Sequence, residues 1–328
     1  MISKNKINLR HYNEEFVQTL ITLGTLIVFV TIISILAPNF LRLENINNVL
    51  IQVSLVMLTG VAVTMLLVSG YFDLSVGGVL ALAGVLYALF CQMDVPTYVS
   101  IFLGVLSGTI FGFINAFLVV KMRITAVIAT IGTMYMARGI ANILADGSMI
   151  ESGLPINFRN ISTMSVGPIN LVLLIVIVVV LIFLFIQKKA VFGRFVYCIG
   201  TNKNAAQLSG IDVETNIFIL YMIVGTMASF SGVVLAAKLG AGISNVGQGF
   251  ELDTIAAAVI GGASISGGKG SVLSTIIGAI IIGIIANALN LLNLYSDYQF
   301  IIKGLVIIAA ILLQRVVYSK IFNTVRDY

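Results

Sequence analysis

Long apolar runs, each close to the length that crosses a lipid bilayer, recur along nearly the whole of this chain. A hydrocarbon layer about 30 Å thick requires about 20 apolar residues per helix. The runs are continuous and do not alternate between apolar and polar positions, so they predict helices and not the strands of a β-barrel. Only 9% of the 328 residues are charged, which leaves no segment polar enough for a separate soluble domain. The sequence therefore predicts an all-α, polytopic membrane protein.

About ten transmembrane segments are expected, at 19–37, 49–69, 75–93, 98–119, 125–144, 169–187, 215–238, 272–292 and 298–314, with a weaker one at 252–264. The weaker segment is too short to span and is followed by the glycine-rich stretch 261–270, which predicts a broken or re-entrant helix packed inside protein. The stretch 69–78, with Asp73 near its centre, also interrupts an apolar run. It is interpreted either as a second break or as an ordinary tight turn.

Lysines and arginines lie on one side of this ten-span arrangement. They gather in the N-terminal tail 1–18, the connection 121–123, the long loop 188–214 and the C-terminal tail 315–328. By the positive-inside rule this side is the cytoplasm, so both termini of the transmembrane domain 19–314 are expected there. The net charge of +5 therefore reflects topology and does not indicate nucleic-acid binding.

The longest external loop and the first apolar run also bear on the topology. The loop 145–168 is the longest segment expected outside the cell. The first apolar run reaches spanning length without a small-residue cleavage site, so it is interpreted as an uncleaved helix and not as a signal peptide.

A polar island, CIGTNKNAAQLSGI at 198–211, separates two long apolar stretches. Asn202 or Asn204 can cap a short helix there, Gln207 suits a capping box with Asn204, and Gly210 can end the helix in a left-handed conformation. A helix of about two turns does not persist alone in water. Its small or apolar residues, Ala205, Ala206 and Leu208, indicate a surface that fits a groove on another protein. The alternative interpretation is a solvated connector.

Five segments resemble, in order, the permease subunits of monosaccharide-type ABC importers, the ribose permeases above all. They are SGYFDLSVGGVLALAG (69–84), ITAVIATIGTMYMARGIANIL (124–144), GRFVYCIGTNKNAAQLSGI (193–211), GFELDTIAAAVIGGASISGGKGSVLSTIIGA (249–279) and QFIIKGLVIIAA (299–310). The resemblance covers roughly 45–312. Families that carry branched-chain amino acids or nucleosides share the architecture and part of the pattern, so they stay open as alternatives.

The resemblance implies a permease of the bacterial inner membrane that works as a pair of permease copies, identical or not. An ATP-binding subunit would dock on the coupling loop, and a sugar-binding protein would deliver a small sugar from outside. The residues that the resemblance assigns to the coupling loop are Gly200, Asn204, Ala205, Ala206, Leu208 and Gly210.

The chain is expected to bind no cofactor of its own. The stretch GGASISGGKGS (261–271) fails the phosphate-loop pattern, because Ala263 replaces the first glycine and Gly270 replaces the hydroxyl residue that binds Mg²⁺. ATP and Mg²⁺ would therefore be bound by the partner subunit. No metal site or nucleophile–base pair is predicted at membrane depth either, so a membrane-embedded enzyme lacks support. An ion-coupled secondary transporter remains the competing class.

Polar residues at membrane depth cost free energy and mark candidate transport paths. Arg138 lies within the fifth segment, and Asp73, Glu251 and Asp253 are the carboxylates that could neutralise it. Amides suit hydroxyl-rich solutes, and they suit helix–helix hydrogen bonds equally well. The candidate residues of a translocation path or broken helix are therefore Asp73, Asn115, Arg138, Asp253, Asn287 and Asn290.

The orientation can be tested with single introduced cysteines. We expect a cysteine at Ser148, in the external loop, to react with a membrane-impermeant thiol reagent added outside intact cells. A cysteine at Asn202, in the coupling loop, should stay unlabelled until the membrane is opened. The reverse pattern would contradict the orientation and move the coupling loop to the outer face.

Overall fold

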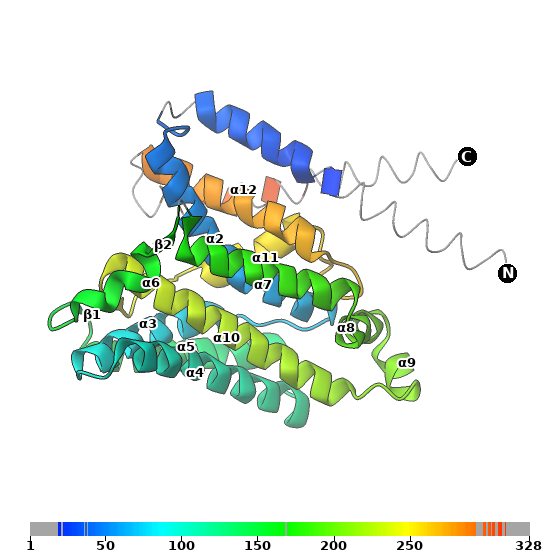
Figure 1. Cartoon of the computed structure of the whole chain (residues 1–328). Helices are drawn as coiled ribbons and strands as arrows, with labels where there is room; N and C mark the ends of the chain where they lie inside the picture. The colour runs from blue at the N-terminus through cyan, green and yellow to red at the C-terminus, as the bar shows by residue number, and fades with distance from the viewer. Residues whose placement is uncertain are drawn as a thin grey trace.

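The computed structural model describes residues 19–20, 22–35, 37, 39–167 and 169–292, and of the remainder only 298–299, 301–302, 304–305, 308–309 and 312. The predicted tails 1–18 and 315–328 and about half of the predicted segment 298–314 therefore lie outside the described residues. In the described part, nearly all regular structure is helical (Figure 1). The all-α prediction is confirmed for that part of the chain.

Six described helices are long and apolar enough to cross a membrane. They are α2 (Leu43–Val68), α4 (Thr97–Ala116) with its π-helical continuation η1 (Phe117–Lys121), α5 (Ala126–Leu144), α7 (Leu171–Lys188), α10 (Val213–Leu239) and α12 (Val272–Leu291). Shorter helices are Thr22–Ile35, α3 (Val76–Gln92), α6 (Asn160–Thr163), α8 (Val191–Thr201), α9 (Lys203–Leu208), α11 (Phe250–Ile260) and the 3₁₀ helix η2 (Ile156–Arg159). The predicted count of about ten spans is therefore not confirmed.

Two of the four predicted spans that are absent from these six, 75–93 and 252–264, correspond to shortened helices; the other two, 19–37 and 298–314, are described only in part. Helix α11 has 11 residues, about 16 Å at 1.5 Å per residue, which is about half the thickness of the hydrocarbon layer. It is entered from an irregular segment and left through the glycine-rich stretch 261–270. Helix α3 begins only after the seven non-helical residues 69–75. Irregular backbone of this kind is tolerated at membrane depth where protein covers it.

Helices α2, α10 and α12 form the interior of the bundle. The apolar windows of α2 and α12 are both 78% buried and that of α10 is 61% buried. Helix α10 packs against α2, α3 and α4, while α12 packs against α2 and α11. Only 22% of the corresponding window of α7 is buried. Helix α7 therefore lies on the outside of the bundle.

Glycines bring α4 and α10 into backbone contact. A Cβ atom added to Gly112 would lie 2.8 Å from the Cα atom of Met222 on α10. One added to Gly225 would overlap the backbone of Gly108 on α4. Small residues at such a crossing permit the close approach on which helix association in lipid depends.

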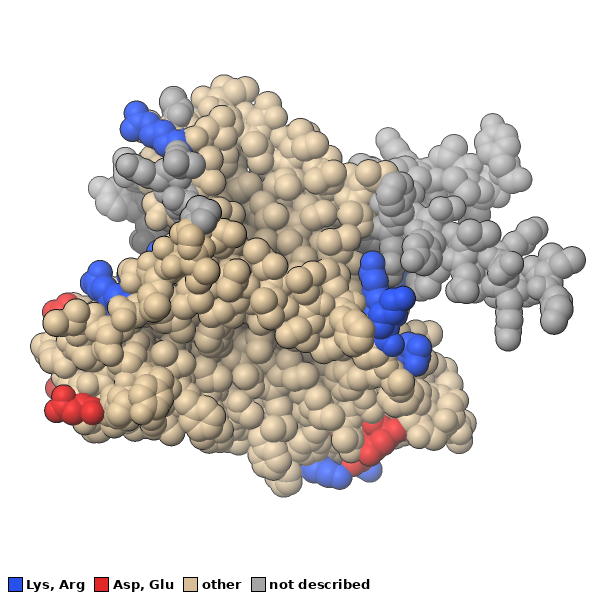
Figure 2. Space-filling model, viewed as in Figure 1, with Lys and Arg blue, Asp and Glu red and all other residues tan. Residues whose placement is uncertain are grey.

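Short strands gather at one end of the bundle. Strand β1 (Met149–Ile150) pairs antiparallel with β4 (Gly242–Ile243), and β2 (Ser165–Val166) with β3 (Ile169–Asn170). These strands belong to or contact the predicted external loop 145–168. The opposite end carries α8 and α9, as Figure 1 shows. In Figure 2 the charged side chains of the described residues lie mainly toward these two ends, with an uncharged belt between them. This distribution is the one that a membrane-spanning bundle requires.

Candidate functional site

The predicted coupling loop 188–214 folds as two helices, α8 and α9. Helix α9 is capped by Asn202, whose Oδ1 accepts a hydrogen bond of 3.0 Å from the backbone N–H of Ala205. Of the two predicted caps, Asn202 is therefore the correct one. The predicted capping box of Asn204 and Gln207 is wrong, because the residue three positions after the actual cap is Ala205. Gly210 has φ of +81°, which confirms the predicted left-handed end of the helix.

The candidate coupling residues differ in their exposure. Leu208 is 91% exposed, whereas Ala206 is only 4% exposed. A Cβ atom on Gly200 would overlap the carbonyl oxygen of Val68 and approach the N atom of Gly268 to 2.7 Å. Ala206 and Gly200 therefore pack within this chain, contrary to the prediction that Ala206 shares an outward surface with Leu208. The outward apolar residue of α9 is Leu208, beside the exposed Ala205.

Helix α9 contacts the connection between α2 and α3. The Nζ atom of Lys203 donates a hydrogen bond of 3.0 Å to the hydroxyl of Tyr71 and lies 5.7 Å from the centre of the same ring. A cavity of about 700 Å³ beside this contact is lined by residues that include Tyr71, Phe72, Lys203 and Asn204. The predicted coupling residue Asn204 therefore lies on a cavity that reaches the 69–75 connection.

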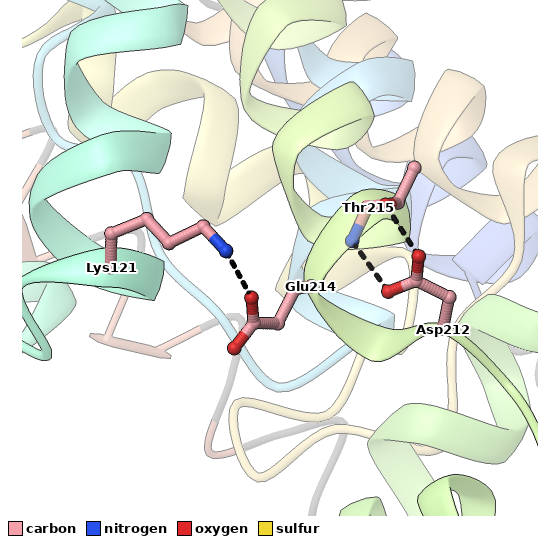
Figure 3. Close-up of polar contacts among 4 residues, drawn as sticks. All are labelled: Lys121, Asp212, Glu214 and Thr215. Carbon is pink, nitrogen blue, oxygen red and sulfur yellow. Dashed lines mark hydrogen bonds and ion pairs between the residues drawn. The ribbon is translucent and has the colours of Figure 1, made fainter.

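The start of α10 is tied to the end of α4 beside the same cavity (Figure 3). Lys121 and Glu214 form an ion pair of 2.5 Å, with both side chains about half exposed. Asp212 caps α10 and accepts hydrogen bonds of 3.0 and 2.6 Å from the backbone N–H and the hydroxyl of Thr215. These hydrogen bonds, the hydroxyl's first, hold the pKa of Asp212 below its ordinary value. The contacts position α10 directly after the coupling segment.

A buried polar network joins the 69–75 connection to α4 and α5. The Oδ1 atom of Asp73 accepts hydrogen bonds from the backbone N–H and the hydroxyl of Ser75 at 2.8 and 2.6 Å. The Nδ2 atom of Asn115 donates to the Ser75 hydroxyl at 2.8 Å and lies 3.4 Å from each carboxylate oxygen of Asp73. The hydroxyl of Thr133 donates to the Oδ1 atom of Asn115 at 2.6 Å. All four residues are at most 1% exposed.

The network brings together two of the predicted path residues, Asp73 and Asn115, from segments 42 positions apart. Asn115 lies two positions before η1, the π-helical turn that begins at Phe117, and such turns are frequent at functional sites. Tyr221 on α10 fixes the connection from the other side through a hydrogen bond of 2.8 Å to the carbonyl of Phe72. Loss of any of these hydrogen-bond donors would raise the free-energy cost of burying the Asp73 carboxylate, because an unpaired buried charge is costly.

Arg138 is held by backbone carbonyl groups. Its guanidinium donates to the oxygens of Val246 and Gly247 at 3.2 and 3.1 Å. The candidates to neutralise Arg138 are Asp73, Glu251 and Asp253. The charge of Arg138 acts on Glu251, so Glu251 is the candidate that the structure favours. Carbonyl oxygens of the irregular backbone before α11 supply the hydrogen bonds to the guanidinium.

Glu251 lies beside Arg138 at the junction of α3 and α11. The positive charge of Arg138 acts on its carboxylate from beyond ion-pair distance. The Oε2 atom of Glu251 is buried and accepts no hydrogen bond from the described residues. A Cβ atom on Gly77, in the first turn of α3, would overlap this oxygen and approach the Gly247 oxygen to 2.6 Å. The first turns of α3 and α11 therefore meet beside Arg138. Together with Glu251 and Asp253, which both lie in the first turn of α11, Arg138 forms a charged junction.

The predicted amides of α12 make contacts within the chain. Asn287 and Asn45 of α2 exchange reciprocal hydrogen bonds of 2.8 and 2.9 Å, and both are buried. Asn290 accepts a hydrogen bond of 3.1 Å from Gln299. In this structure Asn287 therefore serves a helix–helix contact, the second of the two predicted uses for such amides.

Sequence reasoning missed four contributors to these sites, namely Tyr71, Ser75, Thr133 and Lys203. Ser75 had a local signal, because a serine two positions after an aspartate is a common partner in an Asx turn. Thr133 and Lys203 meet their partners over 18 and 132 positions. No spacing within one segment indicates contacts of that length.

Six membrane-length helices, two shortened ones that meet inside the bundle and buried polar groups between them define a multi-pass helical membrane protein. The model of the family described as "Branched-chain amino acid transport system / permease component" matches residues 45–311. The chain therefore belongs to this permease family, and the resemblance found in the sequence is confirmed.

Curated relatives match nearly end to end. A ribose import permease protein of Haemophilus influenzae is 38% identical over 88% of this chain and 90% of its own length. A D-allose transport system permease protein of Escherichia coli is 37% identical over 90% and 91% of the two chains. An L-arabinose transport system permease protein of the same species is 32% identical over 89% and 90%. No solved structure matches the chain significantly.

The buried network can be tested with two threonines on α5. Replacement of Thr133 by valine leaves the Oδ1 atom of Asn115 without its donor, so we expect the free energy of unfolding to fall by about 1–3 kcal/mol. The matched control is Thr130→Val, because the Thr130 hydroxyl bonds carbonyls of its own helix, and its expected change is below about 1 kcal/mol because no polar group is left without a partner. Thermal unfolding in detergent measures both. Equal shifts in the two variants would show that the network adds nothing specific.

Proposed function

We propose that this chain is the membrane permease subunit of an ABC importer for a monosaccharide. The observation that carries the proposal is the similarity over about 90% of both chains to permeases named for ribose, allose and arabinose. All three sugars are small, neutral and rich in hydroxyl groups. The family description alone would point to branched-chain amino acids, so the relatives decide between the two solute classes.

The proposed mechanism is alternating access around a path between helices. The permease has no phosphate loop, so an ATP-binding subunit that holds ATP and Mg²⁺ would supply the difference in free energy between the two states. A second permease copy would complete the path, and an external binding protein would deliver the sugar. The protein would lie in the bacterial inner membrane with both termini in the cytoplasm.

Two sites of this chain have proposed roles in transport. The charged junction of Arg138, Glu251 and Asp253 offers hydrogen-bonding groups at the meeting point of α3 and α11, which suits a hydroxyl-rich solute. The buried network of Asp73 and Asn115 would hold the α2–α3 connection in one conformation. Asn287 and Asn290 have protein partners, so they would enter the path only after those contacts break.

The coupling segment would receive motion from the ATP-binding subunit through α9. Leu208 is the exposed apolar residue that would insert into that subunit, and Ala205 and Asn204 lie beside it. Gly200, Ala206 and Gly210 would support the helix, because the first two pack within the chain and the third ends it. Lys203 contacts Tyr71, so displacement of α9 would act directly on the connection that contains Asp73.

Transport by the reconstituted complex tests the proposed solute and energy source. The permease is purified with a candidate ATP-binding subunit from the same genome and placed in liposomes with a candidate sugar-binding protein. We expect uptake of a pentose or hexose that requires ATP and the binding protein, and no uptake of leucine or a nucleoside. The permease alone should neither hydrolyse ATP nor accumulate sugar in an ion gradient. Gradient-driven uptake by the permease alone would instead establish an ion-coupled secondary transporter.

Docking of the ATP-binding subunit can be tested at Leu208. The substitution Leu208→Arg replaces an apolar contact with a charge, and the loss of a contact worth about 2 kcal/mol would weaken association about thirtyfold. The matched control is Ile156→Arg, because Ile156 is equally exposed but lies at the opposite end of the bundle, in η2. Copurification should fail for the first variant and persist for the second. Normal copurification of both would show that α9 is a solvated connector.

A further inference from the structure

A second cavity, of about 820 Å³, lies where α7 ends. It is open to the surface between the last residues of α7, one face of α8 and one face of α9. Its lining includes Lys188, Lys189, Arg194, Cys198 and Ser209. The cavity described beside Tyr71 lies on the other side of α9, with Asn204 and Gln207 on its wall.

Three positive charges and no carboxylate line this second cavity. Lys188, Lys189 and Arg194 are all exposed, and in the described part of the chain none of them is within ion-pair distance of an acid. Lys121 offers the contrast, since it is paired with Glu214. Figure 2 shows the corresponding concentration of Lys and Arg toward the α8 end of the molecule. The cavity therefore has an uncompensated positive potential.

The floor of the cavity is rigid. Gln187 is buried, and its Nε2 atom donates to the hydroxyl of Tyr197 at 2.5 Å and to the carbonyl of Gly270 at 3.2 Å. Its Oε1 atom accepts a hydrogen bond of 3.0 Å from the backbone N–H of Val272. These bonds fix the end of α7 against α8 and the start of α12. The backbone that carries the three cationic side chains is therefore positioned before any ligand arrives.

The position of the cavity indicates the source of its ligand. Helix α7 is the least buried of the six membrane-length helices, and its last turns expose Ile182 and Phe185 to the acyl chains of lipid. Lys188 ends this helix, so the cavity lies at the depth where lipid headgroups begin. Basic pockets at this boundary attract anionic headgroups, because each cation there gains from the surface charge of the membrane.

We propose that this cavity binds the phosphate headgroup of an anionic phospholipid from the surrounding bilayer. Lys188, Lys189 and Arg194 contact the phosphate, and the acyl chains lie along the exposed end of α7. The bound lipid fills the space between α8 and α9 and so supports the coupling segment from the membrane side.

Cys198 provides the measurement, because it lines the cavity and is exposed whereas Cys91 is buried. The full-length protein is placed in nanodiscs of phosphatidylcholine, with or without about one third phosphatidylglycerol, and alkylation of Cys198 by a charge-neutral maleimide is timed. We expect phosphatidylglycerol to slow alkylation about fivefold or more. The combined variant Lys188→Gln, Lys189→Gln, Arg194→Gln should lose this protection. Arg123→Gln, which removes an exposed base on the other cavity, should keep it.

A reference thiol separates the cavity from a general effect of membrane charge. Cys198→Ser with Gln207→Cys moves the thiol to the other side of α9, so its rate should respond to phosphatidylglycerol much less than that of Cys198. Glycerol phosphate added to phosphatidylcholine discs should not protect Cys198, because the proposed ligand is a lipid. Protection by glycerol phosphate to the same extent would overturn the lipid assignment, as would equal protection in the combined variant. Protection by the ATP-binding subunit but not by phosphatidylglycerol would show that the cavity is a protein contact.

Discussion

The connection between α2 and α3 must keep a carboxylate and irregular backbone satisfied away from water, and the interior of the bundle is arranged to meet this requirement. Ser75 satisfies Asp73 from within the connection, Asn115 reaches it from α4, and Thr133 orients Asn115 from α5. An unpaired buried carboxylate would cost several kcal/mol. The packing of α3, α4 and α5 against one another therefore depends on the conformation of the 69–75 connection.

The same connection lies next to the segment that would meet the ATP-binding subunit. Tyr71 contacts Lys203 of α9, and two positions later Asp73 enters the buried network. Val68, directly before the connection, accepts a hydrogen bond from Gly268 and packs against Gly200. Three segments that are distant in the sequence therefore meet at the end of α2. Helix α9 contacts the connection through Lys203 and Tyr71, so a movement of α9 would reach this meeting point through direct contacts.

The two shortened helices show how a transport protein can place polar groups at membrane depth without exposing them to lipid. The backbone before α11 is irregular, and Arg138 donates to the carbonyl oxygens of Val246 and Gly247 there. The Gly247 oxygen also accepts a hydrogen bond of 3.2 Å from the backbone N–H of Phe250. Gly77 permits the approach of α3 because it has no side chain to collide with Glu251. The first turns of α3 and α11 thus bring the charged side chains of Arg138, Glu251 and Asp253 together at one junction inside the bundle.

The sequence by itself determined the helical membrane class, the positions of most helices, the weak segment before the glycine-rich stretch and the short helix capped near Asn202, because apolar runs and capping residues act locally. Only the tertiary structure decided which polar residues meet. Asn115 binds the Asp73 site, Asn287 binds Asn45, Arg138 binds carbonyls and Ala206 turns inward. Each of these outcomes depends on the rotation and depth of one helix relative to another. Those quantities arise from packing of the whole bundle, and no single segment encodes them.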